Sequence, residues 1–289
     1  MIMRNRWKSG RTEQMKEDKT ERLFPAVILN LSGIYKEEKF WLQGNGNSER
    51  CEQISEISWV DAQDISGTNC YCDEEAAAEI NRRTENVPVA GIHFIDSGNY
   101  HYITRLWIGR IREPFRLLVF DNHTDMQLPA FGGLLSCGGW IAAALEELEK
   151  LCQVILVGPD EEACSQVEDR LKEKVVFLSR EHLASLKKEE ILQELKDILA
   201  GNDLPLYLSI DKDVLGTEDA QTTWSQGDMS LQTLAGCVKQ TLECAEQVPF
   251  KIAGVDICGE CDRESAHDST SNDKANRELL ELFLPIRGK

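Results

Sequence analysis

The chain has 289 residues, of which 32 are basic, 50 are acidic and 42% are hydrophobic. This composition excludes collagen-like, coiled-coil and wholly disordered proteins, and no apolar run approaches the roughly 20 residues of a membrane-spanning helix. The net charge of −18 repels phosphate backbones and anionic membranes, so neither nucleic acid nor a membrane is expected as a partner. The same charge favours a small cationic substrate or a multivalent metal ion.

The N-terminal residues are polar and mixed in charge, which predicts a solvated tail (residues 1–22) before one domain (residues 23–289). They contain no apolar secretion signal, so we expect a cytoplasmic protein whose ten cysteines are reduced. Two close pairs, Cys70 with Cys72 and Cys258 with Cys261, would form a zinc site only if folding brought them together. Buried or idle thiols are the simpler interpretation.

From residue 25 onwards, short apolar runs alternate with stretches of helical spacing. The predicted strands are residues 26–31, 89–95, 116–120, 153–157, 175–178, 206–210 and 252–257. The predicted helices are residues 73–83, 137–151, 161–172, 181–200, 231–248 and 272–284. Because the strands are apolar without alternation, we expect helices on both of their faces. The fold class is therefore α/β, a three-layer α/β/α domain with a central, mostly parallel sheet.

Three of the predicted strand ends carry metal-binding side chains, and in such sheets ligands bind beyond the carboxyl ends of the strands. The six side chains are His101, Asp121, His123, Asp125, Asp211 and Asp213. Residues two apart leave a strand on the same side, so those of each group can converge. Four carboxylates at one edge repel each other unless cations neutralise them, which predicts two divalent metal ions.

Taken singly, each of these residues has an ordinary structural explanation. An Asp after a strand often caps the next helix or forms a turn, and a single His101 would usually be a buried, hydrogen-bonded residue. His93, which lies inside a predicted strand, is expected to be such a core residue. The combination at three strand ends is what favours a metal site.

The same residues resemble the motifs of the ureohydrolase superfamily, which contains arginase, agmatinase and formimidoylglutamase. The segment Asp121-Asn-His-Thr-Asp125 resembles its D-A-H-x-D motif, and Ser209-Ile-Asp-Lys-Asp213 resembles its S-x-D-x-D motif. Gly98-Asn-Tyr-His101 stands where the family has G-G-D-H. The motifs occur in the family's order, and the resemblance covers roughly residues 25–285.

This resemblance implies an arginase-like fold and two Mn²⁺ ions, or another divalent metal, in overlapping ligand sets. One set is His101, Asp121, Asp125 and Asp211. The other is His123, Asp121, Asp211 and Asp213, so that Asp121 and Asp211 bridge the ions. The resemblance implies catalytic roles for Asp121, Asp125 and Asp211, with a metal-bound hydroxide that cleaves a C–N bond of a guanidino or amidino group. Because the family often forms oligomers, a homo-oligomer is expected.

Departures from the family pattern concern the substrate. Members that release urea carry a Glu where this chain has Gly259, and the neighbouring Glu260 is the predicted substitute. The loop after the first motif lacks the family's histidine, which leaves Cys137 as a candidate for substrate contact. Trp224, in the loop after the second motif, could stack on a planar cation. Arginine is therefore not the expected substrate.

Other interpretations stay open beside the hydrolase. The chain could be a catalytically silent metal-binding protein with an arginase-like fold, or a metal amidohydrolase acting on a non-guanidino substrate. Alternatively, Cys137 could be a nucleophile in a glycine-rich loop at a helix N-terminus, where a thiolate is stabilised.

Overall fold

The computed structural model describes residues 22–42, 57–128, 133–248, 250–261 and 270–288. Residues 1–21 of the predicted tail lie outside the described part of the chain. A sheet of parallel strands runs through the molecule in the order β3-β2-β5-β11-β10-β6-β8-β9. Its strands are β2 (Ala26–Asn30), β3 (Ser58–Asp61), β5 (Ile92–Phe94), β6 (Phe115–Phe120), β8 (Leu151–Val157), β9 (Val175–Leu178), β10 (Leu206–Asp211) and β11 (Ile252–Cys258).

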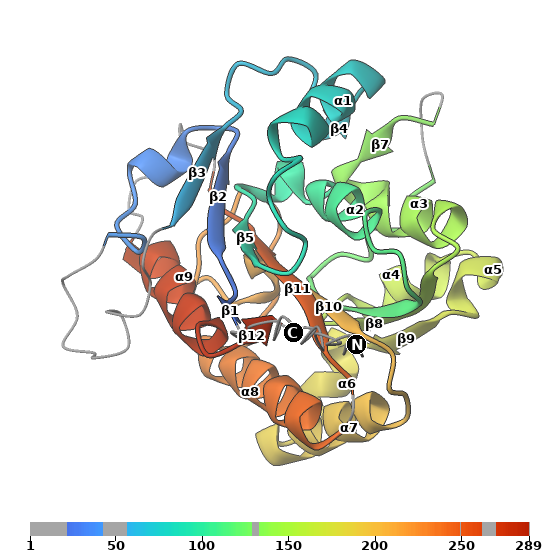
Figure 1. Cartoon of the computed structure of the whole chain (residues 1–289). Helices are drawn as coiled ribbons and strands as arrows, with labels where there is room; N and C mark the ends of the chain where they lie inside the picture. Colours follow the sequence, from blue (N-terminus) through green and yellow to red (C-terminus); the bar gives the residue numbers. More distant parts are fainter. Residues whose placement is uncertain (1–21, 43–56, 129–132, 249, 262–269, 289) are drawn as a thin grey trace, which may run out of the picture.

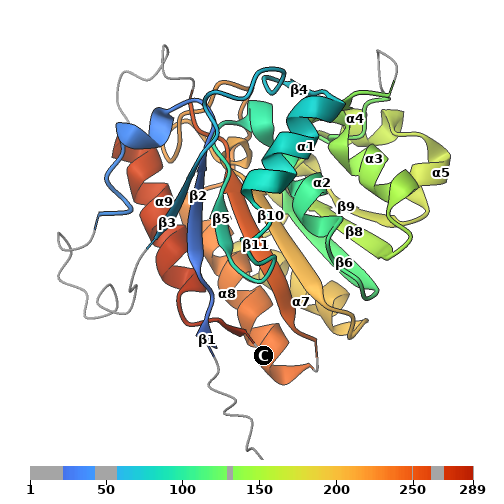
Figure 2. The same cartoon turned by 45° about the horizontal axis from the view of Figure 1, so that its top comes forward.

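Helices cover both faces of this sheet, so the predicted three-layer α/β/α architecture is confirmed (Figure 1). One face packs against α1 (Glu74–Arg83), α2 (Ile103–Ile108), α3 (Trp140–Glu147) and α5 (Asp169–Lys172). The opposite face packs against α6 (Arg180–Ala184), α7 (Lys188–Ala200), α8 (Leu231–Gln247) and α9 (Thr270–Phe283) (Figure 2). The short helix α4 (Glu161–Gln166) follows β8.

Alternation along the strands divides the interior into two cores. In β2, Ala26 and Ile28 belong to the core under α7, α8 and α9, whereas Val27 and Leu29 belong to the core under α1, α2 and α3. Successive strand side chains point to opposite faces, and here both faces are covered. This explains why the strand sequences are apolar throughout and why the sequence shows no two-residue alternation.

Several predicted boundaries were wrong. The expected helix 161–172 is two helices, α4 and α5, because Val167 is extended (φ −61°, ψ 140°) and turns its side chain into the core. The expected helix 181–200 divides into α6 and α7, since Lys187 is extended where it caps α7. The expected helix 137–151 starts as a 3₁₀ turn and ends at Glu147, because residue 151 already belongs to β8. Strand β3 was not predicted.

Two small antiparallel pairs complete the described secondary structure. Strand β1 (Arg22–Leu23) pairs with β12 (Arg287–Gly288), and β4 (Tyr71–Cys72) pairs with β7 (Leu135–Ser136). The second pair brings the segments before α1 and before α3 together near the carboxyl ends of the central strands. None of the described helices is both long and apolar enough to cross a membrane.

Candidate metal centre

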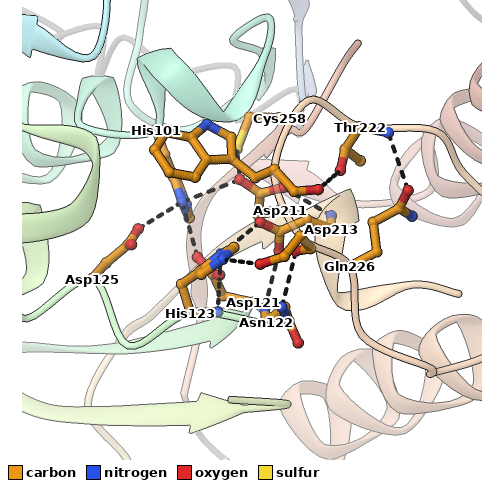
Figure 3. Close-up of polar contacts among 12 residues, drawn as sticks. His101, Asp121, Asn122, His123, Asp125, Asp211, Asp213, Thr222, Gln226 and Cys258 are labelled. Atoms are coloured by element: carbon orange, nitrogen blue, oxygen red, sulfur yellow. Dashed lines mark hydrogen bonds and ion pairs between the residues drawn. The ribbon is translucent and has the colours of Figure 1, made fainter. Parts of the chain in front are cut away.

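The six predicted ligands meet at the carboxyl edge of neighbouring strands β5, β11, β10 and β6 (Figure 3). His101 follows β5 after a short 3₁₀ turn (Gly98–Tyr100), the residues of the first Asp motif follow β6, and Asp211 ends β10. Five of the six side chains are buried, and His123 is partly exposed. The structure therefore brings together the three strand ends that the sequence pointed to.

One ligand group surrounds the buried imidazole of His101. Its Nδ1 atom lies 3.1 Å from Asp121 Oδ2, 3.1 Å from Asp125 Oδ2 and 3.5 Å from Asp211 Oδ2. Neither His101 Nδ1 nor Asp121 Oδ2 has a hydrogen-bond partner, although both are buried. Two ligand atoms about 2.1 Å from one ion lie about 3.0 Å apart when they subtend a right angle. A shared metal ion therefore fits these residues and gives both orphaned atoms a partner.

A second group surrounds His123 and shares Asp121 with the first. His123 Nδ1 lies 2.8 Å from Asp213 Oδ2 and 3.5 Å from Asp121 Oδ1. Asp121 thus presents one oxygen to each histidine. The ligand atoms of each group, His101 with Asp121 and Asp125 and His123 with Asp121 and Asp213, all lie within 4.8 Å of one another. The two groups of potential ligands therefore adjoin one another and share the Asp121 carboxylate.

Burial and crowding of the carboxylates shift the pKa values of this centre. Burial, followed by repulsion from Asp213 and Asp121, raises the pKa of Asp211 to about 7. Burial and repulsion from Asp121 raise the pKa of Asp213 to about 6. Burial lowers the pKa of His123, but hydrogen bonds to Asp121 and Asp213 outweigh it and raise the pKa to about 11. A divalent cation would relieve the same crowding without protons.

Hydrogen bonds from surrounding residues hold the ligands in place. The Ser209 hydroxyl donates to Asp256 Oδ1 at 2.5 Å and lies 2.9 Å from His101 Nε2. Because this hydroxyl uses its proton on Asp256, it accepts from the Nε2–H of His101, which directs Nδ1 to the carboxylates. The indole of Trp140 donates to Asp125 Oδ2 at 2.6 Å.

A cavity of about 240 Å³ opens onto the ligands. Apart from the ligands, it is lined by Cys70, Tyr71, Gly98, Gln127, Ser136, Cys137, Gly138 and Trp224. At about 30 Å³ per water molecule, this space equals about eight waters. It accommodates a small molecule next to the metal positions.

Two of the three predicted substrate residues line this cavity. Trp224 is 40% exposed, donates from Nε1 to Asn99 Oδ1 at 2.8 Å, and has its ring 5.9 Å from that of His123. Cys137 is buried, and burial, with Asp125 adding repulsion, raises the pKa of its thiol to about 12. A thiol that keeps its proton is a poor nucleophile, which opposes the interpretation of Cys137 as a catalytic thiolate.

The third predicted substrate residue, Glu260, does not line the cavity, and that prediction was wrong. Its carboxylate is fully buried, forms an ion pair with Lys212, and accepts hydrogen bonds from Asn272 and Asn276. The adjacent Gly259 has a φ of 88°, and a Cβ atom there would lie 2.3 Å from Asp211 Oδ1. The family's Glu therefore has no room at position 259 of this backbone.

Cys258 is a member of the centre that the sequence analysis did not place there. Its buried Sγ atom lies 3.2 Å from Asp211 Oδ2, and the potential ligand atoms of His101, Asp211 and Cys258 lie within 4.8 Å of one another. Among the described residues, no group of potential ligands joins Cys70 or Cys72 to Cys261. The zinc site made from both cysteine pairs is therefore not formed.

Comparisons with known proteins agree with this geometry. A sequence model described as "Arginase family" matches residues 22–257. The chain belongs to the arginase family. The expected ureohydrolase-like membership is thereby confirmed. A relative in Thermotoga maritima, an uncharacterized protein, is 32% identical over 259 residues, which are 89% of this chain and 88% of the relative.

Solved structures of arginase-family type share the fold at low sequence identity. The formimidoylglutamase of Bacillus subtilis is 17% identical, with a TM-score of 0.67 over 92% of this chain and 88% of the other. The proclavaminate amidino hydrolase of Streptomyces clavuligerus is 14% identical, with a TM-score of 0.65 over 90% of this chain and 92% of the other. These likenesses establish the arginase-like α/β fold of the chain.

Proposed function

We propose that the protein is a binuclear-metal hydrolase that cleaves a C–N bond of a small amidine-type molecule. The observation that carries the proposal is the pair of adjoining ligand groups that share Asp121. The first position would be held by His101, Asp121, Asp125 and Asp211, and the second by His123, Asp121, Asp211 and Asp213. Two Mn²⁺ ions, or other divalent ions, would balance the charge of the four carboxylates.

When bound, the metal ions supply an activated water molecule and stabilise the negative charge that develops on the substrate. The residues of the chain provide the rest of the chemistry. Asp125, fixed by the Trp140 indole, has a carboxylate oxygen at the first position and can accept a proton there. The part-exposed His123, a ligand of the second position in this proposal, borders the cavity. The indole of Trp224 forms a wall against which a planar group can stack.

A non-guanidino substrate is the second candidate, and the surroundings of Gly259 favour it. Within the described part of the cavity lining, the acidic side chains are the metal ligands themselves. Gln127, Ser136 and Cys137 instead offer uncharged hydrogen-bonding groups. An amide would therefore suit this lining as well as a cationic amidine, and both classes belong in a substrate screen.

The first test is the metal content of purified protein after dialysis against Mn²⁺. We expect about two ions per chain in the wild type. Asp213→Ala should lose mainly one of them, and Asp121→Ala, which removes the shared carboxylate, should lose both. Full and equal metal content in both variants would contradict the shared-ligand arrangement.

Turnover is tested on the metal-loaded protein with guanidino, amidino, formimino and simple amide compounds, by release of urea, formamide or ammonia. We expect the wild type to hydrolyse one of these classes of compound. Variants that lack the metal ions should hydrolyse none of them. Two bound ions without turnover of any compound would instead identify a catalytically silent metal-binding protein. Turnover that persists in Asp121→Ala would rule out this centre as the active site.

A further inference from the structure

Strand β11 lies between β5 and β10, and its last residue is Cys258. In the parallel register Cys258 pairs with Asp211, the last residue of β10. The end of β11, which carries the thiol, therefore lies between the end of β5, which leads to His101, and the end of β10, which carries Asp211. Figure 3 shows the sulfur beside these two side chains.

The position of the sulfur is that of a metal ligand. Cys258 Sγ lies 3.2 Å from Asp211 Oδ2, the oxygen that is 3.5 Å from His101 Nδ1. A sulfur about 2.3 Å and an oxygen about 2.1 Å from one ion lie about 3.1 Å apart when they subtend a right angle. The three ligand atoms are mutually within 4.8 Å, as donors around a single ion must be.

A second observation points to a ligand at the same place. His101 Nδ1 and Asp121 Oδ2 are buried and have no hydrogen-bond partner. Both atoms face the space that a metal at the first position would fill. Among the described cysteines, Cys258 is the one that joins a group of potential ligands, whereas Cys237, for example, is part of the apolar core under α8.

We infer that Cys258 binds the metal at the His101 position as a thiolate, so that this position has a mixed nitrogen, oxygen and sulfur ligand set. The inference rests on the proposed function and makes its first metal position more specific. As the sulfur–metal bond forms, the thiol proton leaves to solvent, and the hydrogen bond to Asp211 is given up. The sulfur remains in its thiolate oxidation state, so no electron donor or acceptor is required.

A thiolate changes which metal the position selects. Carboxylates and imidazole accept Mn²⁺ readily, whereas a thiolate favours Zn²⁺ and other softer ions. The first position should therefore prefer Zn²⁺ over Mn²⁺. The second position has nitrogen and oxygen ligands alone, so its preference should follow only the general order of metal affinities. One chain would then hold two unlike metals when both are supplied.

Cobalt substitution tests the inference by absorption spectroscopy. We expect the Co²⁺-loaded wild type to show a sulfur-to-metal charge-transfer band in the near ultraviolet, which Cys258→Ser abolishes while two ions still bind. Cys137→Ser is the matched control, because Cys137 is a buried thiol that lines the same cavity, and its band should be unchanged. A band that survives in Cys258→Ser and disappears in Cys137→Ser would overturn the inference.

A measurement on the wild type alone avoids any effect of substitution on folding. With one zinc ion supplied per chain, X-ray absorption at the zinc edge should show one sulfur neighbour about 2.3 Å from the metal. In competition between Zn²⁺ and Mn²⁺, Cys258→Ser should lower the preference for zinc by about tenfold or more. Zinc or cobalt bound without a sulfur neighbour contradicts only the role of Cys258, whereas failure of the wild type to bind either ion contradicts the proposed function itself.

Discussion

Ser209 is a buried residue whose single hydroxyl positions the imidazole of His101. It connects Asp256 to His101 Nε2, and it has 0% exposure. We predict that Ser209→Ala weakens metal binding at the His101 position by about 10- to 100-fold, because the imidazole loses the partner that fixes its orientation. Titration calorimetry of metal-free protein with Zn²⁺ measures the change.

The control for this prediction is Ser225→Ala. Ser225 Oγ lies 2.9 Å from Nε2 of the other histidine, His123, but this serine is exposed. Water can replace its hydroxyl, so the substitution should leave metal affinity within about threefold of the wild type. Equal losses in the two variants would show that burial of the hydroxyl does not matter for the ligand that it contacts.

Spacing along the chain was sufficient to predict that the six candidate ligands lie close together, but not the direction of Glu260. The ligands follow strands whose carboxyl ends must share one edge, so chain order alone brings them together. Glu260 follows Gly259, whose positive φ turns the backbone, and Lys212 then takes the carboxylate into a buried ion pair. No local pattern reveals such a partner 48 residues away.

The end of β11 approaches the end of β10 so closely that only glycine fits at residue 259. A Cβ atom there would lie 2.3 Å from Asp211 Oδ1 and 2.6 Å from Lys212 N. We predict that Gly259→Ala both destabilises the fold and displaces Asp211, so that metal content falls. Gly133 is the matched control: it also has a positive φ (82°), but an added Cβ would meet no atom of the described residues within 4 Å.

Denaturant unfolding with parallel metal analysis separates the two glycine variants. Gly133→Ala should lower the free energy of unfolding by about 1 kcal/mol, because a left-handed conformation is unfavourable for a residue with a side chain, and the variant should keep its metal. Gly259→Ala should lower the free energy of unfolding by more than Gly133→Ala does, and it should lose metal. Retention of both ions by Gly259→Ala would mean that the two strand ends can move apart without harm to the centre.

Elements were predicted well where burial was uniform and poorly where it was not. Strands β6 and β10 are buried along their whole length, and their largely apolar sequences predicted them. Strand β3 (Ser58–Asp61) is an edge strand with exposed ends, so its sequence lacks such a run. The breaks at Val167 and Lys187 occur inside stretches of good helical spacing. The side chain of Val167 packs into the core, whereas a capping box between the exposed Lys187 and Glu190 starts α7.

At the scale of the whole molecule, the order of the strands lies beyond local sequence patterns. Strand β11 lies between β5 and β10, although more than 150 residues separate β5 from β11. Long-range packing sets this order, and it is the reason that local sequence patterns did not place Cys258 beside Asp211 and His101. Helix and strand types follow from periodicity, but which strand ends become neighbours follows only from the complete sheet.

Stability of the whole molecule should depend on pH through His93, which is in the core as predicted. Its ring stacks on Trp107 at 4.7 Å, its Nε2 donates to Pro88 O at 2.9 Å, and its Nδ1 accepts from the Tyr207 hydroxyl at 3.3 Å. Burial lowers the pKa of His93 from 6.5 to about 4. Between these two pKa values the unfolded chain binds a proton at His93 that the folded chain does not bind. The free energy of unfolding therefore falls as the pH drops below about 6.5.

The size of this effect follows from the shift. Between about pH 7.5 and about pH 5, His93 should remove about 2 kcal/mol from the free energy of unfolding. His93→Gln keeps a donor for Pro88 and an acceptor for Tyr207 but does not titrate, so this part of the loss should disappear. Buried acids such as Asp256, whose pKa burial raises to about 6, act in the opposite direction in both proteins and cancel in the comparison. Parallel slopes of unfolding free energy against pH in the two proteins would contradict this prediction, because His93 would then take up its proton equally in the folded and the unfolded chain.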